Sequence, residues 1–181
     1  MLYAATYAIF YHRGKQDAVL TLLEREYERF RTMLENLQGK KELGLKAIFY
    51  DSIFQDILQS NADIQRRKME LERTSVSQAA LIEIGKMVEA ALEAEKRRYR
   101  EEILAHLRPL ALQTVENKLI GEKMLLNAAF LVAASEEERF DQKVNDISES
   151  FGKKIKFKYV GTLPPYNFAR LSLSLSVSKE G

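Results

Sequence analysis

The stretch Met124-Leu125-Leu126-Asn127-Ala128-Ala129-Phe130-Leu131-Val132-Ala133-Ala134 decides the fold class, because it carries no charge and is dominated by aliphatic side chains. A run of this kind predicts a central β-strand that is buried on both faces. Ser135 and Glu138 follow with the spacing of a capping box, so a helix is expected to begin there and to end at Gly152. Four apolar residues at helical spacing give this helix one buried face: Phe140, Val144, Ile147 and Phe151.

The N-terminal part of the chain shows the same succession of an apolar strand and an amphipathic helix, followed by a charged strand. Residues Leu2–Tyr11 are nearly all apolar or aromatic and predict a second buried strand. An amphipathic helix is expected over Asp17–Leu37, with Gly39 as its stop, and a strand over Glu42–Tyr50. In the C-terminal part, Lys153–Val160 is the corresponding strand after the helix.

Charge distinguishes the strands and predicts their order. The first strand of each unit is nearly free of charge, whereas the second carries several charged residues. Charged residues protect edge strands from further pairing, so 42–50 and 153–160 are expected at the edges and 2–11 and 124–134 in the middle. This order predicts an α+β fold, a modified ferredoxin-like β-α-β-β-α-β antiparallel sheet.

A long helical insertion separates the two halves. Residues 52–73 are mostly polar, and Val76–Leu107 predicts one long helix after a break and N-cap region at Thr74–Ser77. The highly charged middle of this helix, Glu93–Glu102, is expected to be solvated and to project. The whole chain is then one domain, 1–181, that divides into four parts: the first half 1–51, the insertion 52–108, the second half 109–168 and a tail 169–181.

The segment Tyr159-Val160-Gly161-Thr162-Leu163-Pro164-Pro165-Tyr166-Asn167-Phe168 combines rigidity with aromatic side chains. The two prolines fix their own φ and bias the preceding residues toward extended backbone. Two interpretations stay open on physical grounds. The segment either covers one end of the core or presents a docking surface.

Composition excludes several function classes. The formal net charge is +2 and there is no cysteine, so neither strong attraction to nucleic acid nor thiol chemistry is expected. No phosphate loop or hydrolase motif occurs, and His12 and His106 lack metal-pair spacing, so no catalytic residue, metal or cofactor is predicted. No apolar run could span a membrane, which predicts a cytoplasmic protein. The basic run Lys153–Lys158 is interpreted as edge protection, with RNA binding as the alternative.

Residues 124–132 and 157–168 together resemble the C-terminal signature of the gas vesicle protein F/L family. That family has an Asn-Ala-Ala/Tyr-Leu-Val strand followed by a Gly-Pro-x-Pro-Pro-Tyr-x-Phe segment, with Thr162 here in place of the first proline. The run Gly39–Lys46 is similar to the family's Gly-x-x-Glu-x-x-x-Lys strand, and Ile82–Gly85 resembles the start of its long helix. By this resemblance the chain corresponds to the family's C-terminal domain without the domain that usually precedes it.

The resemblance implies an accessory, non-enzymatic protein of gas vesicle formation that binds other gas vesicle proteins, including the shell protein. It implies no nucleic-acid partner and no cofactor; homo-oligomerisation stays open. A ferredoxin-like module that binds a small regulatory ligand is the alternative. The residues expected to form the interaction motif are Asn127, Gly161, Leu163, Pro164, Pro165, Tyr166, Asn167 and Phe168.

Overall fold

The computed structural model describes residues 16–73 and 77–170. These belong to two compact units, and the boundary between the units in the sequence falls between Gln38 and Gly39. The first unit contains α2 (Gln16–Arg25) and α3 (Tyr27–Leu37), where the sequence predicted one continuous helix. The interruption falls at Glu26, whose carboxylate accepts from Arg25 at 3.0 Å and from Arg29 at 2.6 Å. The predicted strand at 2–11 and the tail beyond residue 170 lie outside the described residues.

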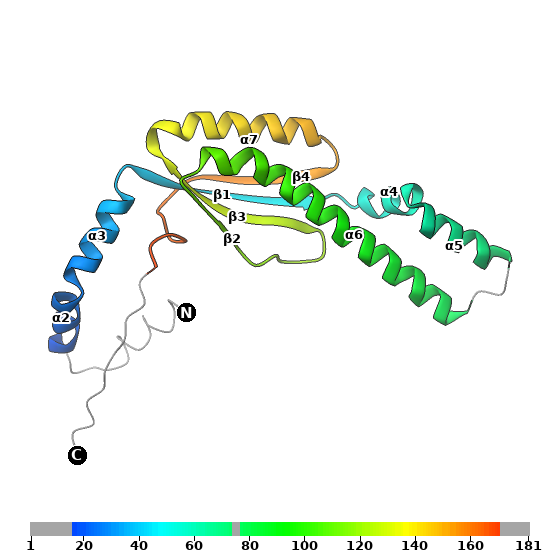
Figure 1. The fold of residues 1–181 in the computed structure, drawn as a ribbon, viewed down its shortest axis with the longest axis horizontal. Helices are drawn as coiled ribbons and strands as arrows, with labels where there is room; N and C mark the ends of the chain where they lie inside the picture. The colour runs from blue at the N-terminus through cyan, green and yellow to red at the C-terminus, as the bar shows by residue number, and fades with distance from the viewer. Residues whose placement is uncertain (1–15, 74–76, 171–181) are drawn as a thin grey trace, which may run out of the picture. The chain divides into compact units, whose positions relative to one another are not determined.

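The second unit is a mixed helix-and-sheet structure with four antiparallel strands in the order β2-β3-β1-β4 (Figure 1). Its elements in chain order are β1 (Lys40–Phe49), α4 (Ser52–Ser60), α5 (Ala62–Arg73), α6 (Gln78–Leu107), η1 (Arg108–Leu110), β2 (Gln113–Glu116), β3 (Met124–Ala133), η2 (Ala134–Glu136), α7 (Glu137–Phe151) and β4 (Ile155–Leu163). The predicted α+β class is therefore confirmed.

The strand order confirms one edge assignment and corrects another. β4 lies at an edge, as its lysines predicted, and β3 lies inside the sheet. β1, however, pairs with both β3 and β4, so the prediction that 42–50 is an edge strand was wrong. From Leu43 to Phe49 buried and more exposed residues alternate, as expected where the described helices cover one face of the sheet, and the charged Lys46 lies on the other face.

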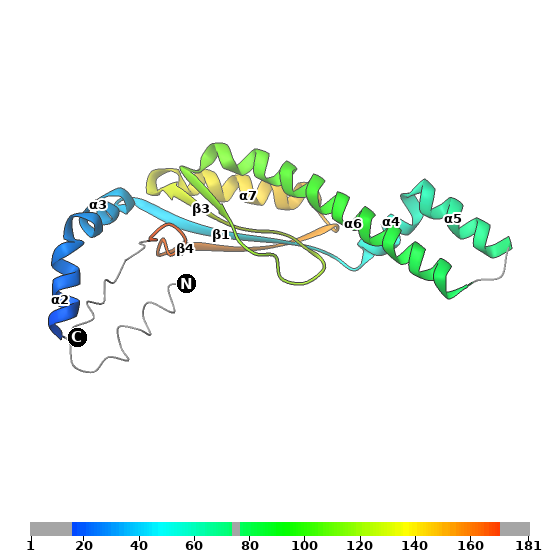
Figure 2. The same cartoon turned by 60° about the horizontal axis from the view of Figure 1, so that its bottom comes forward.

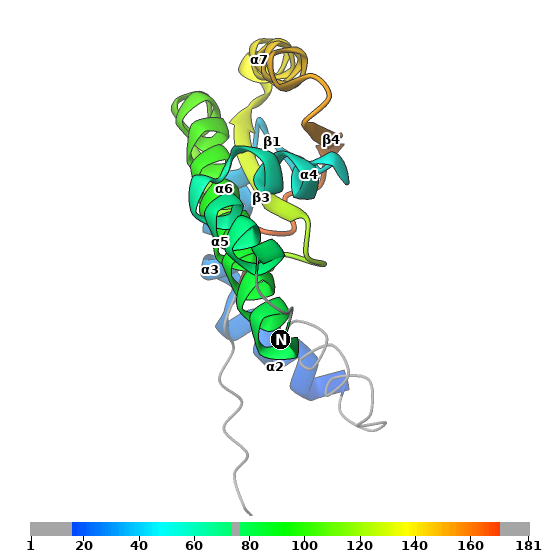
Figure 3. The ribbon, with the colours of Figure 1, turned by 90° about the vertical axis from the view of Figure 1, so that its right-hand side faces the viewer.

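The core lies between that face and helices α6 and α7, which Figures 2 and 3 show on the same side of the sheet. Leu43, Leu45, Ala47 and Phe49 point toward them from β1 and are nearly inaccessible to solvent. Phe130 of β3 meets Phe140 of α7 with ring centroids 5.1 Å apart. The buried faces predicted for the 124–134 strand and for the helix after it are thus in contact.

Between residues 52 and 107 the described part of the chain forms three α-helices, of which α6 is the long one that was predicted. Ser77 caps it, accepting from the backbone N–H of Ala80 at 3.2 Å, as the sequence indicated. The expectation of a solvated middle was right for most of Glu93–Glu102 but wrong for one face of the helix, because Lys96 and Tyr99 are only 7% and 6% exposed. The Tyr99 ring packs edge-on against Phe49 and Phe151, so this part of α6 belongs to the core.

Helix α7 begins differently from its prediction. Ser135 lies within a short 3-10 turn, the N-cap position is Glu136, and no side chain caps the helix. The capping box was therefore wrong. Glu137 and Glu138 nevertheless occupy the first turn, where the helix dipole favours acids, and Gly152 ends the helix with φ +48°.

Candidate functional site: the open face of the sheet and the Pro-Pro turn

The second face of the sheet, here called the open face, is covered by none of the described helices of the second unit (Figure 2). Strand pairing and the alternation of side chains assign these residues of β1, β3 and β4 to this face: Glu42, Gly44, Lys46, Ile48, Asn127, Ala129, Leu131, Lys156, Lys158 and Val160. The segment after β4 contributes to it because Asn167 hydrogen-bonds to Glu42. The predicted interaction motif and the open face are therefore neighbours.

A bulge at the end of β4 redirects the chain toward this face. The pairing of β1 with β4 shifts between Glu42 and Gly44, which leaves one extra residue on β4 near Gly161 and Thr162. Thr162 has φ +46°, a conformation closed to proline, whose φ is fixed near −65°. The Thr162 hydroxyl donates to Glu137 Oε1 at 2.6 Å and so ties the bulge to α7.

The Pro-Pro segment forms a compact turn after the bulge. The N–H of Tyr166 donates to the carbonyl of Pro164 at 2.7 Å, and the N–H groups of Phe168 and Ala169 donate to the carbonyl of Pro165 at 3.1 and 2.8 Å. Tyr166 is 71% exposed, whereas Phe168 is half-buried. The turn is therefore rigid by covalent geometry and by hydrogen bonding, and it presents its tyrosine to solvent.

Asn167 fixes this turn to the sheet through Glu42. Its backbone N–H donates to Glu42 Oε2 at 2.8 Å and its Nδ2 donates to Glu42 Oε1 at 2.5 Å. Glu42 is only 2% exposed, and a carboxylate that is buried without hydrogen bonds is strongly unfavourable. The pair therefore joins residues 125 positions apart and holds the turn over β1.

A hollow of about 350 Å³ lies beside this pair on the open face. Gly44 and Ala129 are among its small lining residues, Leu163 and Asn167 lie at the Glu42 end, and Lys46 and Lys158 are also part of the lining. Asn127 lines it as well and donates from Nδ2 to the carbonyl of Lys118 at 2.9 Å, which holds the β2–β3 connection in place.

The structure thus brings together three of the predicted motif residues, Asn127, Leu163 and Asn167. It places Gly161 and Pro164 at exposed positions and Pro165 half-buried, away from the lining of the hollow. Sequence reasoning missed Glu42 and Lys46 as site residues. A signal for them existed, because both belong to the Gly-x-x-Glu-x-x-x-Lys pattern, and a separation of four places them on one face of a strand.

Two further contacts join the sheet to α7, one from β1 and one from β4. Lys41 forms an ion pair with Glu137, and the hydrogen bonds from Lys41 and then Thr162 lower the pKa of Glu137. The hydroxyl of Tyr159 bonds to Asp141, and burial, followed by this contact, raises the pKa of Tyr159. The edge strand that carries the Pro-Pro turn is therefore held firmly from the helix side.

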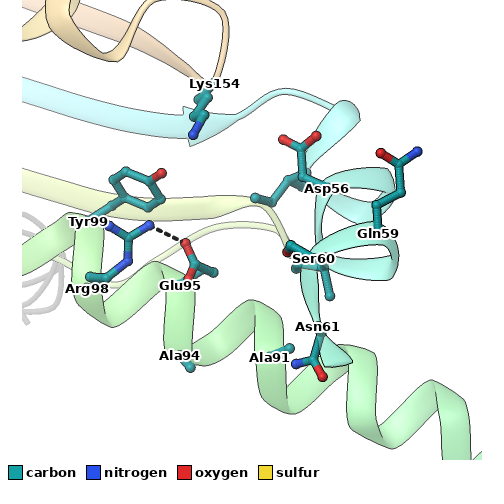
Figure 4. A pocket seen from close by; sticks show the side chains of 12 residues that line it. Asp56, Gln59, Ser60, Asn61, Ala91, Ala94, Glu95, Arg98, Tyr99 and Lys154 are labelled. Atoms are coloured by element: carbon teal, nitrogen blue, oxygen red, sulfur yellow. Dashed lines mark hydrogen bonds and ion pairs between the residues drawn. The ribbon is translucent and has the colours of Figure 1, made fainter. Parts of the chain in front are cut away.

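A second hollow, of about 650 Å³, lies between α4, α6 and the start of β4 (Figure 4). Arg98 donates to Glu95 at 2.6 Å and its guanidinium lies 4.0 Å from the centroid of the Tyr99 ring. These contacts raise the pKa of Arg98, chiefly through Glu95. The lining mixes Asp56 and Glu95 with Arg98 and Lys154, so it shows no preference for one ligand charge.

Neither hollow contains a recognisable catalytic arrangement. Within residues 16–73 and 77–170, no group of three His, Cys, Asp or Glu side chains is placed to hold a metal ion. His106 is exposed, and His12 lies outside the described residues. No helix in this part of the chain is both long enough and apolar enough to cross a membrane.

Comparison with known proteins identifies the family. The model of the family described as "Gas vesicle synthesis protein GvpL/GvpF" matches residues 9–170. The chain belongs to the GvpL/GvpF family. The resemblance drawn from the strand and Pro-Pro-Tyr motifs is thereby confirmed.

Individual relatives agree with this assignment. The chain is 30% identical over 159 residues to gas vesicle protein F of Nostoc sp. (strain PCC 7120 / SAG 25.82 / UTEX 2576), an alignment that covers 86% of this chain and 65% of that protein. It is 30% identical over 152 residues to gas vesicle protein F of Dolichospermum flosaquae, covering 83% and 62%. The chain spans less than two thirds of the length of these relatives.

Solved structures of the family have the same fold. The crystal structure of GvpF from Anabaena sp. PCC7120 superposes with a TM-score of 0.78 at 28% identity, over 86% of this chain and 64% of that one. GvpF from Microcystis aeruginosa gives a TM-score of 0.68 at 24% identity, which bears on the fold alone. The mixed sheet-and-helix architecture is therefore shared with GvpF.

Proposed function

We propose that this chain is an accessory protein of gas vesicle formation that acts by binding other gas vesicle proteins, the shell protein among them. Membership of the GvpL/GvpF family supports the role in gas vesicle formation. The absence of a catalytic arrangement from the described residues is compatible with a binding role. The site proposed for binding is the open face together with the Pro-Pro turn.

The observation that carries this site is the exposure of Tyr166 on a rigid support. Tyrosine is enriched among the residues that dominate binding energy, because it buries a large area while losing little conformational freedom. Here the turn is already ordered by two prolines and by the Asn167–Glu42 pair. Little conformational entropy of the turn is therefore lost when a partner covers Tyr166.

The strand order also supports a ferredoxin-like fold for the second unit. From β1 through α6, β2, β3 and α7 to β4, the order is β-α-β-β-α-β, and β1 and β3 are the inner strands. In this proposal the first strand of the motif is 40–49 and α6 is its first helix. The open face is then the face that the two helices of the motif leave uncovered.

The decisive experiment is co-purification with gas vesicle proteins in a cell that produces vesicles. Wild-type chain is expected to retain the shell protein, and Pro165→Ala/Tyr166→Ala is expected to retain it at least tenfold less well. Tyr50→Ala is the matched control, because Tyr50 is also an exposed tyrosine, at 45%, but directly follows the other end of β1. Equal retention by wild type and the double variant would contradict the proposed site, and no retention by wild type would contradict the proposed function.

A further inference from the structure

Three lysines gather on the open face without a partner. Lys46 of β1 and Lys156 and Lys158 of β4 are exposed, and within the described residues none of them forms an ion pair. Lys46 and Lys158 are directly opposite one another in the strand pairing. Like charges in that position are destabilising, so the isolated fold gains nothing from this arrangement.

Gly44 is a second feature that the isolated fold does not require. It lies in the middle of an inner strand, where glycine weakens the strand by roughly 0.5–1 kcal/mol relative to alanine. Its φ is not positive, and a Cβ there would meet its nearest atoms, on Leu163 and Val160, at 3.9 Å, an ordinary contact distance. Neither backbone strain nor crowding accounts for it. A glycine inside a strand often marks a bulge or a place where a ligand or another backbone approaches closely; Gly44 borders the β1–β4 bulge and also lines the hollow, and the extra residue of the bulge lies on β4, not on β1.

The lysines of the open face and Gly44 lie next to each other, and together they indicate the chemistry of a ligand for this face. Gly44 and Ala129 leave the hollow of about 350 Å³ lined in part by apolar Val160 and Leu163. Lys46 and Lys158 supply positive charge to the same hollow, roughly 7 Å along the strand from Gly44 at about 3.3 Å per residue. Glu42 does not offset that charge locally, because its oxygens are bound by Asn167 and it lies about 13 Å from Lys46 along β1.

We propose that the open face docks an acidic, aliphatic peptide segment of a partner protein. An aliphatic side chain enters the hollow over Gly44, and a neighbouring carboxylate lies between Lys46 and Lys158. The bound carboxylate removes the repulsion between the two lysines. This inference rests on the proposed function and names the chemistry of the partner segment.

RNA fits this face less well, although a ferredoxin-like sheet with lysines is compatible with it in principle. Sheets that bind RNA stack bases on aromatic side chains of the inner strands. The open-face residues of β1 and β3 include no aromatic ring. The described aromatic residues of β4, Phe157 and Tyr159, pack on the core side against Phe151 and Phe140.

The test is selection of peptides from a displayed random library on the immobilised full chain. Enriched peptides are expected to carry Asp or Glu beside an aliphatic residue, and a labelled enriched peptide should bind Lys46→Gln/Lys158→Gln at least tenfold more weakly than wild type. The matched control is Lys68→Gln/Lys86→Gln, which makes the same charge change at exposed positions of α5 and α6. Thermal unfolding checks that all variants fold.

Several outcomes would overturn the proposal. They are enrichment of peptides without acids, equal binding by the Lys46/Lys158 variant, salt-sensitive retention of single-stranded RNA through the same lysines, or a dimer of the wild-type chain that the variant dissociates. The co-purification assay separates the two proposals. If Lys46→Gln/Lys158→Gln retains gas vesicle proteins as wild type does, the peptide site is wrong while the proposed function stands.

Discussion

The two faces of the sheet in the second unit differ in the physical cause of their residue types. On the core side, Leu43, Leu45 and Phe130 are inaccessible to solvent and each is explained by packing against α6 or α7. On the open face, Gly44 and the Lys46–Lys158 pair oppose the stability of the isolated fold. Packing therefore explains the residues of the first face, whereas the proposed binding role would explain those of the second, and substitution tests this contrast.

The largest expected effect is the loss of a buried ring from the core side. Phe130→Ala should lower the free energy of unfolding by about 3–5 kcal/mol, because it removes a fully buried side chain and leaves a cavity next to Phe140. Val160→Ala on the open face, where Val160 is 51% exposed, should change it by no more than about 0.5 kcal/mol. Urea unfolding measures both. Similar losses for the two variants would remove the distinction between the faces.

An intermediate effect is expected at Glu42, which is a buried charged residue on the open face. Asn167→Ala removes one of its two hydrogen bonds and should lower the free energy of unfolding by about 1.5–3 kcal/mol, as for other hydrogen bonds to charged groups. Calorimetry measures the loss, and hydrogen exchange should show faster exchange of the Phe168 and Ala169 amides. Unchanged exchange there would mean that the Asn167 side chain does not hold the turn.

A smaller effect should appear in the pH dependence of stability. The pKa of Glu137 is lowered by Lys41 and then by Thr162, so its carboxylate stabilises the folded state above the ordinary glutamate pKa of about 4.3. This contribution is lost as the pH falls through the lower folded-state pKa. Glu137→Gln should therefore lose less stability than wild type between neutral pH and about pH 3. Parallel pH curves from urea unfolding would show that the ion pair does not stabilise the bulge.

The smallest expected effect is a gain on the open face. Lys158→Glu places a carboxylate opposite Lys46 and should raise the free energy of unfolding by about 0.2–1 kcal/mol, more at low salt than at high salt. Lys158→Gln, which only removes repulsion, should gain less. A loss of stability in both variants would mean that the lysine pair is favourable in the isolated fold, which contradicts the argument drawn from it.

Local patterns predicted most of the elements because they depend on neighbours in the chain. The apolar run at 124–134, the helical periodicity up to Leu107 and the Ser77 cap each contain their own signal and were confirmed. The capping box at Ser135 failed, because a 3-10 turn shifted the helix start to Glu137. The charges of β1 were also misassigned, since an inner strand with one open face carries charged residues too, such as the exposed Lys46.

The sequence by itself determined the family, the alternation of strands and helices, and the rigidity of the Pro-Pro turn, because these follow from residue type and spacing. Only the tertiary structure decided that β1 is an inner strand, that Glu42 is the partner of Asn167, and that the lysines of two strands meet. The physical reason is that strand order and the pairing of residues 125 positions apart depend on the packing of the whole sheet, for which no local pattern is a substitute.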